Sequence, residues 1–151
     1  MAVTALTSVK SILVPVDGSD AAYQALGLAA DIAKRAHARL HLLYVIEVPR
    51  SMALDMPIDA ELQRAERVLD RAEKLASECG VEVAGDLVQA RQAGHAVVDE
   101  AVERGVDTIV IGVGYDRPYG EYALGDFAEY VLKHAPAQVW IIRSAEPSAG
   151  R

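Results

Sequence analysis

Four near-continuous apolar runs recur along the chain. They are SILVPV (11–16), LHLLYVI (40–46), TIVIGV (108–113) and QVWII (138–142). Unbroken apolar runs are typical of parallel strands that are covered on both faces, whereas half-exposed strands alternate apolar and polar residues. A fifth segment, VEVAGDLVQA (81–90), alternates more, so we expect it to lie nearer an edge of the sheet.

Segments with helical periodicity separate these strands. In each segment apolar residues recur at steps of three and four, which places them on one face of a helix. The long sets are Ala22, Leu26, Ala29, Ala33 and Ala36, then Leu62, Ala65, Leu69, Ala72, Ala76 and Cys79; the shorter sets are Val97, Val98, Ala101 and Val102, then Phe127, Ala128, Val131 and Leu132. The order βαβαβαβαβ predicts right-handed crossovers and a single α/β domain, an open, five-stranded parallel sheet with helices on both faces.

Residues with strong preferences for helix ends support these boundaries. Ser19 or Asp20 can cap the first helix through a side-chain oxygen. Pro57 suits the first turn of the second helix, behind Asp55. Gly80 stands where a left-handed residue would end that second helix.

Length and composition restrict the class of protein further. A chain of 151 residues is about one domain, and no apolar run approaches the ~20 residues needed to cross a bilayer. The apolar N-terminal segment lacks a cleavage site, and the single cysteine, Cys79, cannot form an internal disulfide, so we expect a cytoplasmic protein without membrane contact. The net charge of −7, with no basic cluster, disfavours nucleic-acid binding. The histidines lack metal-ligand spacing, so we expect no metal site.

The first candidate site follows the first strand. In an open α/β sheet, ligands bind beyond the carboxyl ends of the strands, where the strand order reverses. The motif VPVDGSD places Asp17 at such an end. Its carboxylate could accept hydrogen bonds from an adenine amine or ribose hydroxyls, and it could equally satisfy the backbone of an Asp-Gly turn. The loop EVPRSMALDMPID (47–59) follows the second strand, and we expect a surface connection there rather than a lid over this edge.

The second candidate site is the stretch IVIGVGYDRPYGEYALGDFAE (109–129), which predicts a strand, a glycine-punctuated loop and the start of a helix. Such a layout usually holds a phosphate, because the N–H groups of a helix N-terminus point outward at the positive end of the helix dipole. Here Asp126 stands where the helix begins. Aspartate is a favourable N-cap, and Glu129 three residues later completes a pattern similar to a capping box. We therefore expect Asp126 to cap the helix and to occupy the anion position.

Four of these motifs together resemble one known family. VPVDGSD after the first strand, LLYVIEV as the second, DTIVIG before the glycine loop, and GDFAEYVLKHAPAQVWIIR at the close are similar in order and spacing to the universal stress protein (UspA-like) family. The resemblance covers residues 9–143, which leaves an N-terminal extension (1–8) and a flexible tail (144–151). It implies a Rossmann-like fold, similar to that of adenine-nucleotide alpha hydrolases, that usually dimerises through its last strand. The dimer contacts would be Val139, Trp140 and Ile141.

Many members of this family bind ATP or another adenine nucleotide, and others do not. By resemblance, the nucleotide-binding residues would be Pro15, Asp17, Val45, Gly112, Gly125 and Asp126. ATP-binding members carry the pattern G-x2-G-x9-G-(S/T) in the glycine loop. In this chain Gly112 and Gly125 keep their places, whereas Tyr115 replaces the second glycine and Asp126 replaces the final Ser or Thr.

Both replacements disfavour a triphosphate. A tyrosine side chain crowds the backbone approach that glycine allows, and a carboxylate accepts hydrogen bonds but cannot donate one to phosphate. Two like unit charges ~4 Å apart cost about 4 kcal/mol at an effective dielectric near 20. The sequence therefore predicts weak or no ATP binding.

Three functions remain in competition. The first is a non-catalytic, homodimeric stress-response protein that requires no cofactor. The second is a sensor of AMP, ATP or a cyclic nucleotide, in which Tyr115, Tyr119 or Tyr122 stacks on adenine and Arg117 holds a single phosphate. The third, a slow ATP hydrolase or ATP-pyrophosphatase-like enzyme, is least favoured, because VDGSD lacks the serine-rich double-glycine loop such an enzyme needs.

Overall fold

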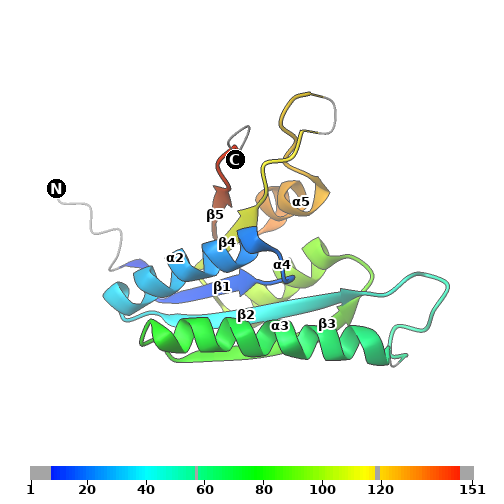
Figure 1. The fold of residues 1–151 in the computed structure, drawn as a ribbon, viewed down its shortest axis with the longest axis horizontal. Helices are drawn as coiled ribbons and strands as arrows, with labels where there is room; N and C mark the ends of the chain where they lie inside the picture. The colour runs from blue at the N-terminus through cyan, green and yellow to red at the C-terminus, as the bar shows by residue number, and fades with distance from the viewer. Residues whose placement is uncertain (1–7, 57, 118–119, 147–151) are drawn as a thin grey trace.

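Five parallel strands form one sheet, with helices on both of its faces (Figure 1). The computed structural model describes residues 8–56, 58–117 and 120–146. The strands are β1 (Ser11–Pro15), β2 (Arg39–Glu47), β3 (Val83–Ala90), β4 (Thr108–Val113) and β5 (Gln138–Arg143). The helices are α2 (Asp20–Ala36), α3 (Asp59–Glu78), α4 (Ala93–Arg104) and α5 (Asp126–His134). This confirms the predicted α/β fold class.

The strand order is β3-β2-β1-β4-β5, with β1 in the centre and β3 and β5 at the edges. The chain moves outward from β1 to β3 and then returns to place β4 on the other side of β1. The order therefore reverses between β1 and β4, which is where an open α/β sheet forms its ligand crevice. The alternating segment 81–90 does supply the edge strand β3, as expected.

Each face of the sheet buries its own apolar cluster. On β1, Ile12 and Val14 pack in the cluster that includes α2 and α3, whereas Leu13 points to the cluster that includes α4 and α5. All three side chains are fully buried. Burial on both faces is the physical reason for the unbroken apolar run in the sequence, because successive residues of a strand point to opposite faces.

The helix ends agree with the sequence at two places and differ at a third. Ser19 is the N-cap of α2, and its Oγ accepts a hydrogen bond from Ala22 N at 3.2 Å. Gly80 follows α3 with φ +80, which is the left-handed conformation expected there. Asp55 does not begin α3: it lies in a turn closed by Met56 N donating to Ala53 O, and the helix starts at Asp59. The prediction for Pro57 falls outside the described residues.

None of the helices in the described part of the chain is both long enough and apolar enough to cross a membrane.

Candidate functional site

A pocket of about 590 Å³ opens at the carboxyl edge of the sheet, between the start of α4 and the start of α5. It is lined by Pro15, Val16, Asp17, Ala22, Leu43, Val45, Glu47, Gln92, Ala93, Gly94, His95, Val97, Ile111, Gly112, Asp126, Phe127 and Tyr130. Every nucleotide-binding residue suggested by the sequence lines it except Gly125, which directly precedes Asp126. The fold thus brings together residues that are more than 100 positions apart in the sequence, because parallel strands end at a common edge.

Asp17 serves the turn after β1 and lines the pocket as well. Its Oδ1 accepts a hydrogen bond from Ser19 N at 2.9 Å, so the carboxylate stabilises the turn that leads into α2. The side chain is exposed, and its other oxygen accepts no hydrogen bond within the described part of the chain. The structural and the binding interpretations of Asp17 are therefore compatible.

The start of α5 corrects the prediction for Asp126. Gly125 is the N-cap, with φ +91, and no side chain of the described residues donates or accepts a capping hydrogen bond at this helix end. A cap at positive φ favours glycine over aspartate, because L side chains rarely adopt that conformation. The carbonyl of Gly125 accepts the first helical hydrogen bond, from Glu129 N at 3.2 Å. Asp126 is the first helical residue, and within the described chain its carboxylate has no hydrogen-bond or ion-pair partner.

Glu47 was not identified as a site residue from the sequence. It ends β2, and its Oε2 accepts a hydrogen bond from Ala93 N, the first residue of α4, at 3.1 Å. The N-cap position of α4, Gln92, provides no side-chain hydrogen bond. A carboxylate from another element therefore caps α4 inside the pocket. The available signal was an acidic residue directly after the apolar run at 40–46.

The pocket wall carries a negative charge. Asp17, Glu47 and Asp126 all line it, and no described Lys or Arg does. His95 also lines the pocket, and its ring stacks on Tyr130 with centroids 4.1 Å apart. Phosphate groups would therefore meet carboxylates here without a fixed positive charge to offset them.

The loop after β4 turns its aromatic and cationic side chains away from the pocket. Tyr115 and Tyr122 lie beside each other, with ring centroids 5.7 Å apart, and the guanidinium of Arg143 lies over both rings. Arg117 donates to Gly120 O and forms an ion pair with Glu146, 3.0 Å from Nη1 to Oε1. None of these residues lines the pocket.

This placement corrects two expectations about the loop. The Tyr115 side chain does not crowd the pocket, and Arg117 is not placed to hold a phosphate there. The reason is that β5 and the segment after it supply partners, Arg143 and Glu146, which the sequence pattern did not indicate. Tyr119 falls outside the described residues.

Gly112 has a packing role. A Cβ built on this residue would lie 2.1 Å from Ala21 O and 2.9 Å from Ala25 Cβ, both on α2. Only glycine allows α2 to approach β4 this closely. The first glycine of the loop motif is therefore explained by helix–sheet packing, whether or not a phosphate ever lies beside it.

The segment between β2 and α3 is held beside the end of β3 by side-chain hydrogen bonds. Arg91 Nη1 donates to Val48 O, Pro49 O and Met52 O at 3.3, 2.5 and 2.8 Å. Gln89 Nε2 donates to Leu54 O and Met56 O at 3.1 and 2.9 Å. None of the described residues of this segment, 48–56 and 58, lines the pocket. These contacts agree with a surface connection and not with a lid.

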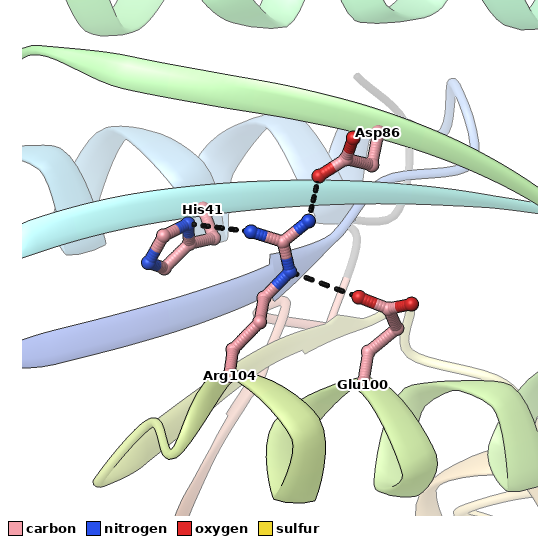
Figure 2. Close-up of polar contacts among 4 residues, drawn as sticks. All are labelled: His41, Asp86, Glu100 and Arg104. Carbon is pink, nitrogen blue, oxygen red and sulfur yellow. Dashed lines mark hydrogen bonds and ion pairs between the residues drawn. The ribbon is translucent and has the colours of Figure 1, made fainter.

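A second polar cluster lies apart from the pocket and joins α4 to the sheet (Figure 2). Arg104, the last residue of α4, donates from Nε to Glu100 Oε2 at 2.9 Å, pairs through Nη2 with Asp86 on β3, and contacts His41 Nδ1 on β2 at 3.3 Å from Nη1. The hydrogen bond to Glu100 raises the pKa of Arg104. Burial lowers the pKa of His41, and Arg104 and Arg39 lower it further against the opposite effect of Asp86 and Glu100.

Removing the guanidinium is expected to raise the pKa of His41. In wild type this pKa lies below 6.5, so the unfolded chain takes up the proton first as the pH falls and stability declines below about pH 6.5. In Arg104→Gln the pKa of His41 should move upward, and the loss of stability that His41 causes at low pH should become smaller. NMR titration of the imidazole signals measures the shift, with the exposed His37 as internal control. An unchanged His41 pKa in the variant would contradict the electrostatic role of Arg104.

The fold and the pocket define a class, an open α/β domain with a pocket at the point where its strand order reverses. The sequence profile of the Universal stress protein family matches residues 8–143. The chain therefore belongs to the universal stress protein family.

Among its relatives is Universal stress protein MJ0531 of Methanocaldococcus jannaschii, 29% identical over 140 residues, 89% of this chain and 82% of that protein. A solved universal stress family protein from Burkholderia pseudomallei is 31% identical, with a TM-score of 0.70, over 91% of this chain and 97% of the other. The universal stress protein of Archaeoglobus fulgidus, solved in complex with dAMP, is 24% identical with a TM-score of 0.71, over 88% of this chain and 97% of the other. That last similarity establishes a shared fold only.

Proposed function

We propose that this chain is a non-catalytic, homodimeric stress-response protein of the cytoplasm whose pocket does not hold the triphosphate of ATP. The observation that carries this proposal is the carboxylate of Asp126 in the first turn of α5, which lines the pocket and has no partner among the described residues. Asp126 is exposed, so a phosphate ~4 Å away would meet a repulsion of about 1 kcal/mol per pair of unit charges in water, which rises to about 4 kcal/mol where the effective dielectric is near 20. Asp17 and Glu47 add repulsion of the same sign.

The part of the pocket formed by β1 and β2 supports binding of an adenine-containing ligand. Pro15, Asp17 and Val45 all line it, next to the apolar side chains Leu43 and Ile111. The similarly folded protein solved with dAMP makes adenine the first ligand class to test. An adenine-nucleotide sensor is the second candidate function, since a ligand with fewer charges than ATP would meet less repulsion.

The chemistry of the pocket lining favours binding over turnover. Its described residues include no Ser, Thr, Cys or Lys, the side chains that most often act as nucleophiles in group transfer. The carboxylates of Asp17 and Glu47 already accept hydrogen bonds from backbone N–H groups. We therefore assign no catalytic residue.

The edge strand β5 supports the dimer. Val139, Trp140 and Ile141 are only half-buried, although they belong to the closing apolar run. Gln138 N and Ser144 N donate toward β4, and N–H groups alternate in direction along a strand, so those of Val139 and Ile141 point to the open edge. Unpaired edge groups with apolar neighbours are a template for pairing with a second chain.

ATP with Mg²⁺ is expected to leave the melting temperature of wild type within about 1 °C of its value without ligand. Asp126→Ser removes the charge and supplies a donor, so millimolar ATP should raise the melting temperature of this variant by about 3 °C or more. Thermal denaturation followed by circular dichroism measures both. Tyr115→Gly is the matched control, since Tyr115 does not line the pocket and its replacement should not restore ATP binding. Stabilisation of wild type by several degrees would overturn the proposal.

A further inference from the structure

Two of the helices that begin at the pocket, α4 and α5, present their amino ends to carboxylates of the protein itself. Glu47 accepts from Ala93 N at the start of α4, and Asp126 occupies the first position of α5. Asp17 contributes a third carboxylate from the turn after β1. The two positive helix ends that would attract an anion are thus already opposed by negative side chains.

Three arginines of the segments around the pocket are engaged elsewhere. Arg91 is directed at carbonyls of the segment between β2 and α3, and Arg117 is paired with Glu146. Arg143 lies over Tyr115 and Tyr122. Each of these three cations has a partner outside the pocket, and no described Arg or Lys lines the pocket itself.

The remaining lining indicates the shape and polarity of a suitable ligand. Leu43, Val97 and Ile111 provide apolar surface, and Phe127 and Tyr130 provide aromatic surface. A volume of about 590 Å³ falls in the range of small-molecule sites. Carboxylates accept hydrogen bonds only, so they complement amine and hydroxyl donors. The complementary ligand is flat and partly apolar, offers several donors and carries no negative charge.

We propose that this pocket selects its ligand by charge and takes an adenine nucleoside whose sugar end is neutral or cationic, in preference to the corresponding nucleotide. The inference rests on the proposed function for the adenine moiety and adds the charge class of the ligand. Asp126 is the residue that determines this specificity, because its carboxylate is the one that makes no hydrogen bond within the described chain.

Three ligands that share the adenine base and the ribose, and differ in charge at the 5′ end, test how affinity depends on charge. They are 5′-amino-5′-deoxyadenosine with a positive 5′ end, adenosine with a neutral one, and AMP with a negative one. Isothermal titration calorimetry on the full chain at low salt is expected to give that order of affinity, with about tenfold or more between the amine and AMP. Raising the salt to 1 M should reduce the ratio, because exposed charges are screened.

Two variants that each remove one negative charge test whether the charge dependence of the affinity comes from the pocket. Asp126→Asn keeps the shape of the side chain, and the ratio between the amine and AMP should fall by about tenfold. Asp116→Asn removes an exposed carboxylate that does not line the pocket, and it should leave the ratio unchanged. Circular dichroism confirms that both variants are folded. An unchanged ratio in Asp126→Asn would reject the role of Asp126.

The other outcomes separate this inference from the proposed function. If AMP binds as tightly as adenosine or more tightly, selection by charge is wrong, although the failure to hold ATP can still be correct. If none of the three ligands binds, the nucleoside assignment is rejected, while the ATP experiment keeps its own result. Strong binding of ATP by wild type would reject both.

Discussion

Alanine at position 112 is expected to destabilise the chain by about 3 kcal/mol or more, through overpacking between α2 and β4. The added Cβ would lie 2.1 Å from Ala21 O and 2.6 Å from Ala21 C, and both of these atoms belong to backbone. A helix backbone cannot move aside as the end of a flexible side chain can. Relief would require α2 to shift away from β4 and would open the apolar cluster between them.

Gly114→Ala provides the matched control for Gly112→Ala. Gly114 directly follows β4, two residues after Gly112, and a Cβ built there meets nothing within 4 Å. Urea denaturation of both variants should give a strongly lowered midpoint for Gly112→Ala and a midpoint near wild type for Gly114→Ala. Equal midpoints would show that α2 yields at little cost, and the packing explanation of Gly112 would then be wrong.

This result bears on how the loop motif is interpreted. If packing alone requires Gly112, the presence of this glycine carries no information about phosphate binding. The residue of the motif whose side chain bears on a phosphate is Asp126, which lines the pocket. The motif therefore indicates the family more reliably than it indicates the ligand.

Ile141→Lys is expected to convert the proposed dimer into a monomer. Ile141 is half-buried on β5, and its backbone N–H points to the open edge of the sheet. A lysine there would place a positive charge beside its copy across the interface and would remove apolar contact, which should raise the dimer dissociation constant by about 100-fold. Sedimentation velocity at micromolar concentration measures the change. Trp140→Glu, on the other face of β5, should act in the same direction.

Val102→Lys is the control for the dimer experiment. Val102 is an exposed apolar residue, with 60% of its surface accessible, and it lies on α4, which packs on β2, β3 and α5. Its replacement changes the charge equally but should leave the dimer intact. Melting temperatures close to wild type would establish that Ile141→Lys is folded. A dimer that persists in both β5 variants would reject the β5 interface.

The strands could be predicted because burial on both faces leaves a local mark in the sequence. The apolar run at 108–113 coincides with β4, and the run at 11–16 exceeds β1 by one residue. The helix α3 was harder to delimit, because its start depends on the turn around Ala53 and Met56 and not on periodicity. Local patterns report which face is buried, but they report the ends of elements less well.

The position of the site could also be predicted, for a topological reason. Parallel strands end at one edge, so Asp17, Val45 and Gly112 had to lie near one another once the strand pattern was recognised. What could not be predicted is the partner of each polar group. Glu47 caps a helix 46 residues later, and His41 meets Arg104 at a separation of 63 residues.

The amino-acid pattern was thus sufficient for the α/β architecture, for the place of the pocket and for the acidic residue at the start of α5. Three-dimensional packing was needed to give Gly125 rather than Asp126 the cap position, to turn Arg117 toward Glu146, and to make Gly112 a contact for α2. The physical reason is the separation along the sequence over which each property is determined. Burial is encoded in neighbouring residues, whereas a side chain takes its partner from all the groups that the finished fold brings within a few ångströms.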